Sequence, residues 1–135
     1  MKVVLDTNVL LAAMFTRGLC ESLLDECLTS GRSVVLCDHI INEFIEHAAG
    51  KFGAPKDSVE RAIRALRANA VFVDPAVVPA DSCRDADDLP VLGAAVAGAA
   101  DLIVTGDRDL LTLAAFRGIR ILSPREFHTL IHGKG

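Results

Sequence analysis

Short runs of Val, Ile and Leu alternate along this 135-residue chain with longer segments whose apolar residues recur at helical spacing. This alternation is typical of a parallel sheet that is covered by helices on both faces. It predicts an α/β fold, a three-layer α/β/α sandwich with a central, mostly parallel sheet of about five strands. The segments that we expect to form the strands are 2–5, 34–37, 71–73, 102–105 and 120–122.

Helical segments are expected between these strands. The segment 89–100 is apolar nearly all round, which predicts a deeply buried helix. Ser123, Pro124 and Glu126 have the spacing of a capping box and predict the start of the last helix. No repeat or linker interrupts the chain, so we expect one domain over residues 1–135. The remaining expected helices are 9–15, 19–30, 38–50, 59–70 and 109–116.

Composition and local sequence exclude several classes of protein. Asp6 comes too early for an export signal, and 89–100 is too short to cross a bilayer, so we expect no membrane contact. The net charge of −4 argues against coating nucleic acid by bulk electrostatics. Four cysteines have neither the C-x-x-C spacing nor that of a zinc ribbon, which predicts free thiols in a cytoplasmic protein. They are Cys20, Cys27, Cys37 and Cys83.

Carboxylates follow the predicted strands where those strands end. Asp6 follows the first strand, Asp38 the second, and Asp107 comes two residues after the fourth. Parallel α/β sheets bind ligands just beyond the carboxyl ends of their strands, so these acids should meet at one edge. Further acids near this edge are Glu43, in the helix after the second strand, and Asp85, Asp87 and Asp88, before the buried helix.

Acids gathered at neighbouring strand ends repel one another. Adjacent strands lie about 4.8 Å apart, and two like charges about 4 Å apart cost about 4 kcal/mol at an effective dielectric constant of 20. Such a cluster must take up protons or bind cations. Carboxylate oxygens without His or Cys suit Mg²⁺ or Mn²⁺, and these ions support the attack of water on a phosphodiester.

Each acid also has a purely structural interpretation. Asp38 is a candidate N-cap of its helix, and Asp6 is a candidate turn residue. Glu43 fits an exposed helical position. Asp87 or Asp88 fits the cap of the buried helix, and Asp107 or Asp109 fits the cap of the short helix after the fourth strand.

Taken together, these motifs resemble those of the PIN-domain ribonuclease family, and in particular a bacterial branch of toxin components akin to VapC toxins. The resemblance implies a metal-dependent endoribonuclease that leaves a 5′-phosphate and a 3′-hydroxyl. It further implies a cognate antitoxin and a homodimer. The matching segments are 4–10, 42–44, 83–88, 103–111 and 121–127.

The family resemblance also assigns roles to individual residues. This branch often continues the Asp-rich loop with an acid and a Lys, where this chain has Leu89 and Pro90. Asp88 is our choice of loop ligand, with Asp85 as the reserve. The implied quartet for Mg²⁺ or Mn²⁺ is Asp6, Glu43, Asp88 and Asp107, with Asn8 and Thr105 as orienting residues and Asp85 and Asp109 as outer ligands.

Three arginines recur every third residue on one helix and are candidate contacts for RNA phosphates, namely Arg61, Arg64 and Arg67. A solvated face with pairs at i, i+4 explains the same spacing. Arg108, beside Asp107, is a better placed phosphate contact.

The histidines do not indicate a transition-metal site. His39 and His47 flank Glu43, but eight residues of helix separate the two histidines by about 12 Å, too far to share one ion. His128 and His132 lie one turn apart without an evident third ligand, so we expect a surface pair.

Two other functions fit an acidic site on such a sheet. The first is a Mg²⁺-dependent phosphatase with Asp6 as nucleophile, although haloacid-dehalogenase phosphatases carry a second Asp where this chain has Asn8. The second is a catalytically silent module that binds RNA or protein. Four carboxylates that repel one another argue against the silent module.

Overall fold

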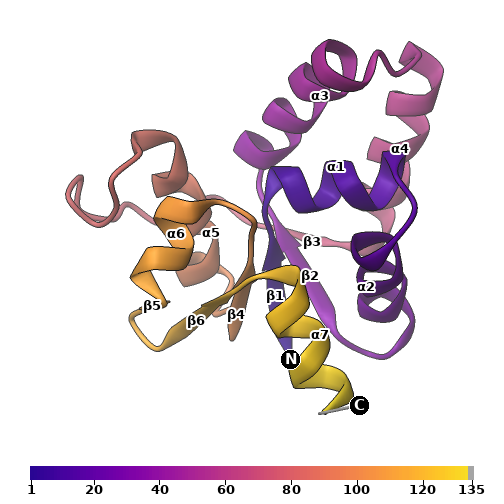
Figure 1. Ribbon diagram of the computed structural model, residues 1–135. Coiled ribbons are helices and arrows are strands. Elements are labelled where there is room, and N and C mark those ends of the chain that lie inside the picture. The colour runs from indigo at the N-terminus through magenta and orange to yellow at the C-terminus, as the bar shows by residue number, and fades with distance from the viewer. Residues whose placement is uncertain (134–135) are drawn as a thin grey trace.

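The computed structural model describes residues 1–133 and arranges them as a six-stranded sheet between helices (Figure 1). In chain order the elements are β1 (Lys2–Leu5), α1 (Thr7–Phe15), α2 (Leu19–Thr29), β2 (Ser33–Leu36), α3 (Asp38–Phe52), α4 (Lys56–Asn69), β3 (Val71–Phe72), the 3₁₀ turn η1 (Ala86–Asp88), α5 (Leu89–Ala97), β4 (Leu102–Val104), α6 (Arg108–Leu113), β5 (Ala115–Phe116), β6 (Ile119–Leu122) and α7 (Pro124–His132).

The strands lie in the order β3-β2-β1-β4-β6-β5. All neighbours are parallel except β5 and β6, which are antiparallel. The chain builds outward from β1 to β3 on one side and then returns to place β4 against the other side of β1. In such sheets a crevice opens at this change of direction, beyond the carboxyl ends of the two strands. The topology therefore places the ends of β1 and β4 at the mouth of that crevice.

Helices cover both faces of the sheet, as the sequence pattern predicts. Helices α1 and α2 lie on one side, and α5 and α6 lie on the other (Figure 1). The central strand β1 is almost wholly apolar and has Val3, Val4 and Leu5 buried. Buried residues Val91 and Leu92 show that α5 packs tightly against the core. The rigid sheet thus fixes the positions of the residues that follow its strands.

The prediction of a helix over 109–116 is wrong for residues 114–116. Helix α6 ends at Leu113, because Ala114 adopts a φ of 63°, and β5 then pairs with β6. Arg117 and Gly118 join the two strands with φ values of 51° and 81°. Two successive positive φ values are those of a two-residue type I′ hairpin turn, which Gly favours. The sheet consequently has a sixth strand.

Other boundaries differ less from the expectations. Helix α5 ends at Ala97 rather than at residue 100, and α3 continues to Phe52, where the left-handed Gly53 terminates it. The capping box at the start of α7 is confirmed: Ser123 Oγ accepts from the Glu126 N–H at 3.1 Å, and Glu126 Oε1 accepts from the Ser123 N–H at 2.9 Å.

All four cysteines are free. Among residues 1–133, no helix combines the length and the apolar character needed to cross a membrane.

Candidate metal centre

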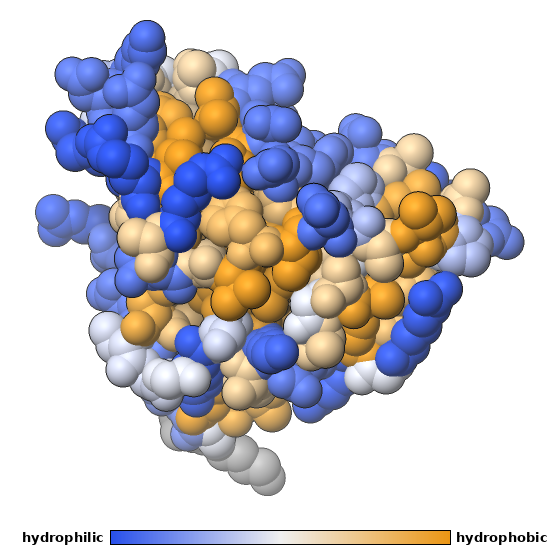
Figure 2. Space-filling view, turned by 180° about the vertical axis from the view of Figure 1, so that it is seen from behind, coloured by the Kyte–Doolittle hydropathy of each residue, from blue (hydrophilic) through white to orange (hydrophobic). Residues whose placement is uncertain are grey.

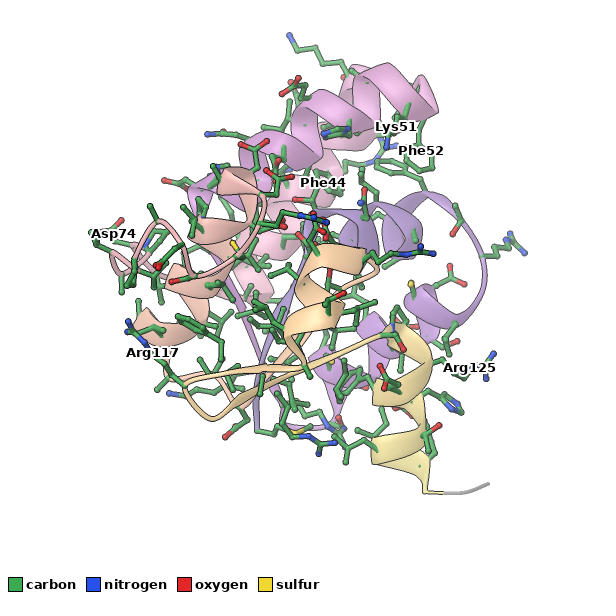
Figure 3. The ribbon with its side chains drawn as sticks, turned by 60° about the vertical axis from the view of Figure 1, so that its left-hand side comes forward. Phe44, Lys51, Phe52, Asp74, Arg117 and Arg125 are labelled. Atoms are coloured by element: carbon green, nitrogen blue, oxygen red, sulfur yellow. The ribbon has the colours of Figure 1, made fainter. Side chains whose placement is uncertain are left out.

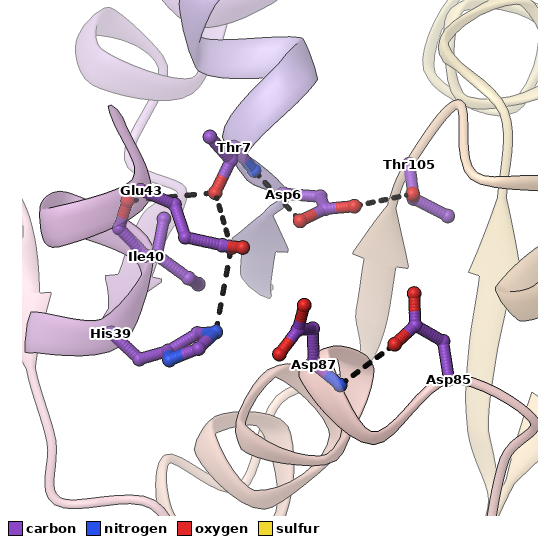
Figure 4. A network of polar contacts seen from close by, with 8 residues as sticks. All are labelled: Asp6, Thr7, His39, Ile40, Glu43, Asp85, Asp87 and Thr105. Carbon is purple, nitrogen blue, oxygen red and sulfur yellow. Dashed lines mark hydrogen bonds and ion pairs between the residues drawn. The ribbon is translucent and has the colours of Figure 1, made fainter. Parts of the chain in front are cut away.

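Asp6 and Thr105 continue the two central strands into the crevice. The Asp6 N–H donates to Val104 O at 3.1 Å, and the Thr105 N–H donates to Leu122 O at 2.9 Å, so the sheet's pairing fixes both backbones. Thr105 Oγ1 donates to Asp6 Oδ2 at 2.7 Å, and the Thr7 N–H donates to Asp6 Oδ1 at 2.7 Å (Figure 4). Asp6 therefore has both carboxylate oxygens held in place while it caps α1.

Burial dominates the electrostatics of Asp6. The residue is only 6% exposed, and loss of water raises the pKa of its carboxyl above the usual value of 3.8. The hydrogen bonds from Thr105 and Thr7 work in the opposite direction, and the charge of Asp107 adds to the rise. An additional positive charge near Asp6 would favour its ionised form.

Asp107 lies beside Asp6 and is fixed through the same threonine. Its N–H donates to Thr105 Oγ1 at 2.9 Å. Its Oδ1 accepts from the N–H groups of Asp109 and Leu110 at 2.8 and 3.2 Å, which makes Asp107 the N-cap of α6. The structural interpretation of Asp107 as a cap is thus confirmed, and it leaves Oδ2 without a role in capping.

The three acids of the loop before α5 have different surroundings. Asp85 caps η1, because its Oδ1 accepts from the Asp87 N–H at 2.9 Å, and both residues are exposed (Figure 4). Asp88 is 6% exposed, makes no side-chain cap bond to α5, and has a buried Oδ2 without a hydrogen-bond partner among residues 1–133. The interpretation of Asp88 as a simple helix cap is therefore wrong.

Asp88 carries the largest electrostatic cost in the site. Burial first, and then the charges of Asp107 and Asp6, raise the pKa of its carboxyl from 3.8 to about 7. Buried polar groups are almost always satisfied, so an orphaned carboxylate oxygen calls for an explanation. A cation bound at this oxygen would offset the cost of its burial.

The structure brings three carboxylates close enough to share one ion. Asp88, Asp107 and Asp109 each offer an oxygen, and these oxygens lie within 4.8 Å of one another. Asp109 is half-buried and forms an ion pair with the exposed Arg84 at 3.9 Å. The donor set is oxygen only, which suits Mg²⁺ or Mn²⁺ better than zinc.

Glu43 lies on the opposite wall of the same cleft. Thr7 Oγ1 donates to Glu43 Oε1 at 3.2 Å, and His39 Nε2 lies 3.4 Å from the same oxygen (Figure 4). Helix α3 therefore presents Glu43 toward the start of α1, next to Asp6. Glu43 is not part of the group of three carboxylates, whereas Asp109, which the sequence placed only as an outer ligand, is.

The cleft between these walls has a volume of about 210 Å³. Sequence reasoning overlooked Thr7, and it weighed His47 only as a ligand for a transition metal. Lys51 was also missed. His47 and Lys51 follow Glu43 at four-residue intervals, so helical spacing alone could have placed them on its face. The lining residues are Asp6, Thr7, Asn8, Glu43, His47, Lys51, Asp85, Asp87, Asp88 and Asp107.

Several residues expected near the site lie elsewhere or act differently. Asn8 lines the cleft, but within residues 1–133 it makes no hydrogen bond to Asp6, whose partners are Thr7 and Thr105. Arg108 is exposed at the start of α6. Arg61 and Arg64 lie exposed on α4 and are not among the residues that line this cleft.

The interpretation of Asp38 as a helix cap is wrong, whereas the expected surface pair of His128 and His132 is confirmed. Asp38 does not cap α3 through its side chain; Cys37 is the N-cap residue, and Asp38 pairs with Arg67 at 3.4 Å. At the C-terminal end of the described chain, His128 and His132 pack with ring centroids 4.4 Å apart. His132 Nε2 also lies 3.0 Å from Glu26 Oε2. These three residues form a surface contact between α7 and α2.

The fold and the cleft define a class of α/β protein with an acidic site, suited to divalent cations, at the topological switch of its sheet. The sequence profile described as the PIN domain matches residues 2–109. The chain belongs to the PIN-domain family.

Comparison with solved structures agrees with this assignment at the level of the fold. The crystal structure of VapBC2 from Rickettsia felis, bound to a DNA fragment from their promoter, contains a similar chain with a TM-score of 0.62 and 12% sequence identity. The match covers 91% of this chain and 98% of that chain. Comparison with curated protein sequences finds no significant match.

Proposed function

We propose that this protein is a metal-dependent endoribonuclease and the toxin of a toxin–antitoxin pair. The observation that carries the proposal is the buried Asp88 carboxylate, whose Oδ2 has no partner beside Asp107 and Asp109. Burial of a carboxylate next to two like charges is costly, and a cation that joins the three offsets that cost. Membership of the PIN-domain family supports a nuclease.

Asp88 and Asp107 are the inner ligands in this proposal, and Asp6, beside Asp107, and Glu43, on the opposite wall, complete the quartet. Asp109 joins them as a ligand, and Asp85 is assigned to capping η1. Bound Mg²⁺ or Mn²⁺ would supply charge stabilisation and an activated water for hydrolysis of an RNA phosphodiester. The P–O3′ bond breaks, and the products carry a 5′-phosphate and a 3′-hydroxyl.

The residues around the acids orient them for this role. Thr105 donates to Asp6 and accepts from the Asp107 N–H, so one buried hydroxyl fixes the Asp6 carboxylate relative to the backbone of Asp107. Thr7 donates to both Asp6 and Glu43, through its N–H and its hydroxyl. Preorganised groups avoid reorganisation during the reaction, which is how such sites accelerate it.

The sequence counts against the phosphatase alternative. Haloacid-dehalogenase phosphatases carry a second Asp two residues after the nucleophile, where this chain has Asn8. The exposed Arg108 is our candidate contact for the RNA backbone next to the cleft, and Arg61 and Arg64 are candidate contacts farther away.

The proposed partners follow from the family and its structural neighbour. The similar solved structure is a VapBC2 complex bound to promoter DNA, which supports an antitoxin partner for this chain. We propose a cytoplasmic homodimer, and the four free cysteines fit a reducing compartment. Light scattering of the purified protein tests the dimer, and rescue of growth by the product of a neighbouring gene tests the antitoxin.

Cleavage of total RNA tests the enzymatic proposal. We expect the wild-type protein with Mn²⁺ or Mg²⁺ to cut RNA and to leave 5′-phosphates, and we expect EDTA or Asp6→Asn to abolish the cleavage. The matched control is Asp81→Asn, an exposed acid outside the cleft, which should cut like the wild type. Intact RNA with a metal-dependent rise in melting temperature would instead favour the phosphatase. Absence of any metal effect would favour the silent binding module.

A further inference from the structure

A second cavity adjoins the acidic cleft and is larger, with a volume of about 350 Å³ against about 210 Å³. Residues 73–78, after β3, form one wall, the start of α3 with Asp38 and His39 forms another, and Leu89 and Pro90 form the third. Apolar side chains gather across the middle of the face shown in Figure 2, on the side where the chain runs from β3 toward α5 (Figure 1).

Residues that line this cavity are neighbours of residues that line the proposed catalytic cleft at two points. Asp88 belongs to the acidic cleft, and the next residue, Leu89, lines the second cavity. His39 lines the second cavity as well, and its Nε2 lies 3.4 Å from Glu43 Oε1. A group that enters the cavity and contacts His39 is therefore one side chain away from Glu43 of the acidic cleft.

The walls of the cavity are fixed by backbone contacts. The Val73 N–H donates to Leu36 O at 3.0 Å, and the Ala76 N–H donates to Gly93 O at 3.0 Å. Gly93 has no room for a side chain, since a Cβ there would lie 2.3 Å from Ala76 O. The cavity is therefore formed before a ligand arrives, as small-molecule sites usually are.

The chemistry of the cavity selects a neutral, flat ligand that donates hydrogen bonds. Its interior is apolar, and its rim carries the Asp38 carboxylate, which is paired with Arg67, and the Asp74 carboxylate, which disfavours a phosphate inside the cavity. An unpaired nucleobase has apolar faces. Cytosine, adenine and guanine also carry an amino group, from which a carboxylate can accept a hydrogen bond. Histidine is among the side chains on which unpaired RNA bases stack, which suits His39.

We infer that this cavity, between residues 73–78 and the starts of α3 and α5, binds the base of a nucleotide next to the scissile phosphate and favours bases with an amino group over uracil. The inference rests on the proposed endoribonuclease function. Arg67 lies at the same rim, with its guanidinium 3.4 Å from Asp38 Oδ1 and 4.7 Å from the centre of the Phe72 ring. It is placed to contact the phosphate of that nucleotide.

Abasic RNA oligonucleotides test the inference. A set of oligonucleotides is made around one mapped cleavage site, and each lacks a single base. We expect base removal at one flanking position to lower the rate of Mn²⁺-dependent cleavage by the wild type at least tenfold, and uracil at that position to lower it as well. Ala76→Leu, which fills the cavity, should cut the intact and abasic oligonucleotides within twofold of each other.

Matched variants separate this effect from general damage. Ala80→Leu lies exposed in the same loop outside the cavity and should keep the wild-type dependence on the base. Asp74→Asn lies at the outer edge of the molecule (Figure 3), so it should fold normally and change which base is preferred. This second variant keeps the inference testable if Ala76→Leu does not fold. Arg67→Ala should make the slope of the logarithm of the RNA-binding constant against the logarithm of the salt concentration shallower by about 1. Arg125→Ala on α7 should leave this slope unchanged.

The outcomes distinguish the inference from the proposed function. Cleavage that is insensitive to base removal at every position, or equally sensitive in Ala76→Leu, would overturn the inference and leave the ribonuclease intact. Absence of metal-dependent cleavage of the intact oligonucleotide would overturn both. If Ala76→Leu keeps the wild-type cleavage pattern but no longer binds the antitoxin, the cavity is a protein-docking surface and the inference is wrong.

Discussion

Replacement of Asp88 by Asn should stabilise the metal-free protein at alkaline pH. The wild-type carboxyl is 6% exposed, and its pKa rises from 3.8 to about 7 on folding because of burial and of the charges of Asp107 and Asp6. A group whose folded pKa is raised binds its proton more tightly in the folded state. Folding stability is therefore lost as the pH rises from 3.8 through about 7.

The size of the effect follows from the shift in pKa. A rise of about three units at 1.36 kcal/mol per unit gives an upper bound of about 4 kcal/mol above pH 7. Asn has the same shape and carries no charge, so Asp88→Asn removes this cost. We expect the variant to be more stable than the wild type by about 2 to 4 kcal/mol at pH 8 in EDTA, and the two proteins to differ little at pH 4.

Urea unfolding at pH 4 and pH 8, followed by circular dichroism in EDTA, measures both proteins. Thermal unfolding gives a second readout. Each kcal/mol of stability raises the melting temperature of a chain of this size by about 3 °C, so the variant at pH 8 should melt about 6 to 12 °C above the wild type. Asp81→Asn, in an exposed acid outside the cleft, should match the wild type at both pH values. A variant less stable than the wild type at pH 8 would refute the argument that Asp88 is a costly buried charge.

Three further substitutions test the framework around the site. Thr105→Val removes the hydroxyl that donates to Asp6 and should cost about 2 to 3 kcal/mol in urea unfolding; a loss below 0.5 kcal/mol would contradict the role given to this hydroxyl. Gly93→Ala places a Cβ 2.3 Å from Ala76 O and should cost about 2 kcal/mol or more, and an unchanged melting temperature would show that the loop is free to move. Ser123→Ala removes the cap of α7 and should lower the free energy of unfolding by about 1 kcal/mol. An unchanged free energy of unfolding would show that α7 does not take part in the cooperative transition.

The parallel sheet could be predicted from the sequence because its strands are continuous apolar runs. Strand segments buried on both faces must be apolar, and residues 3–5 of β1 and the whole of β4 meet that condition. The two-residue strand β5 could not be found by periodicity, since Ala115–Phe116 is too short to show any. The pair Arg117–Gly118 was the available signal, because Gly in a two-residue loop favours a hairpin.

The acids of the site were visible for a similar reason, since they stand where the strands end. Their grouping was not visible, because it depends on how the loop before α5 packs against α6. That packing buries Asp88 and brings Asp109 within reach of Asp107. The role of Thr7 was also hidden, because Glu43 reaches it only after α3 folds against α1.

The rate at which one RNA oligonucleotide is cut at saturating Mn²⁺ tests the central claim most directly. The wild type and Asp88→Asn are compared after circular dichroism shows that both are folded. We expect the variant to be at least a hundredfold slower, because it loses the buried carboxylate that the proposed ion requires. Equal rates for the two proteins would contradict the claim that the acids around Asp88 form the catalytic metal site.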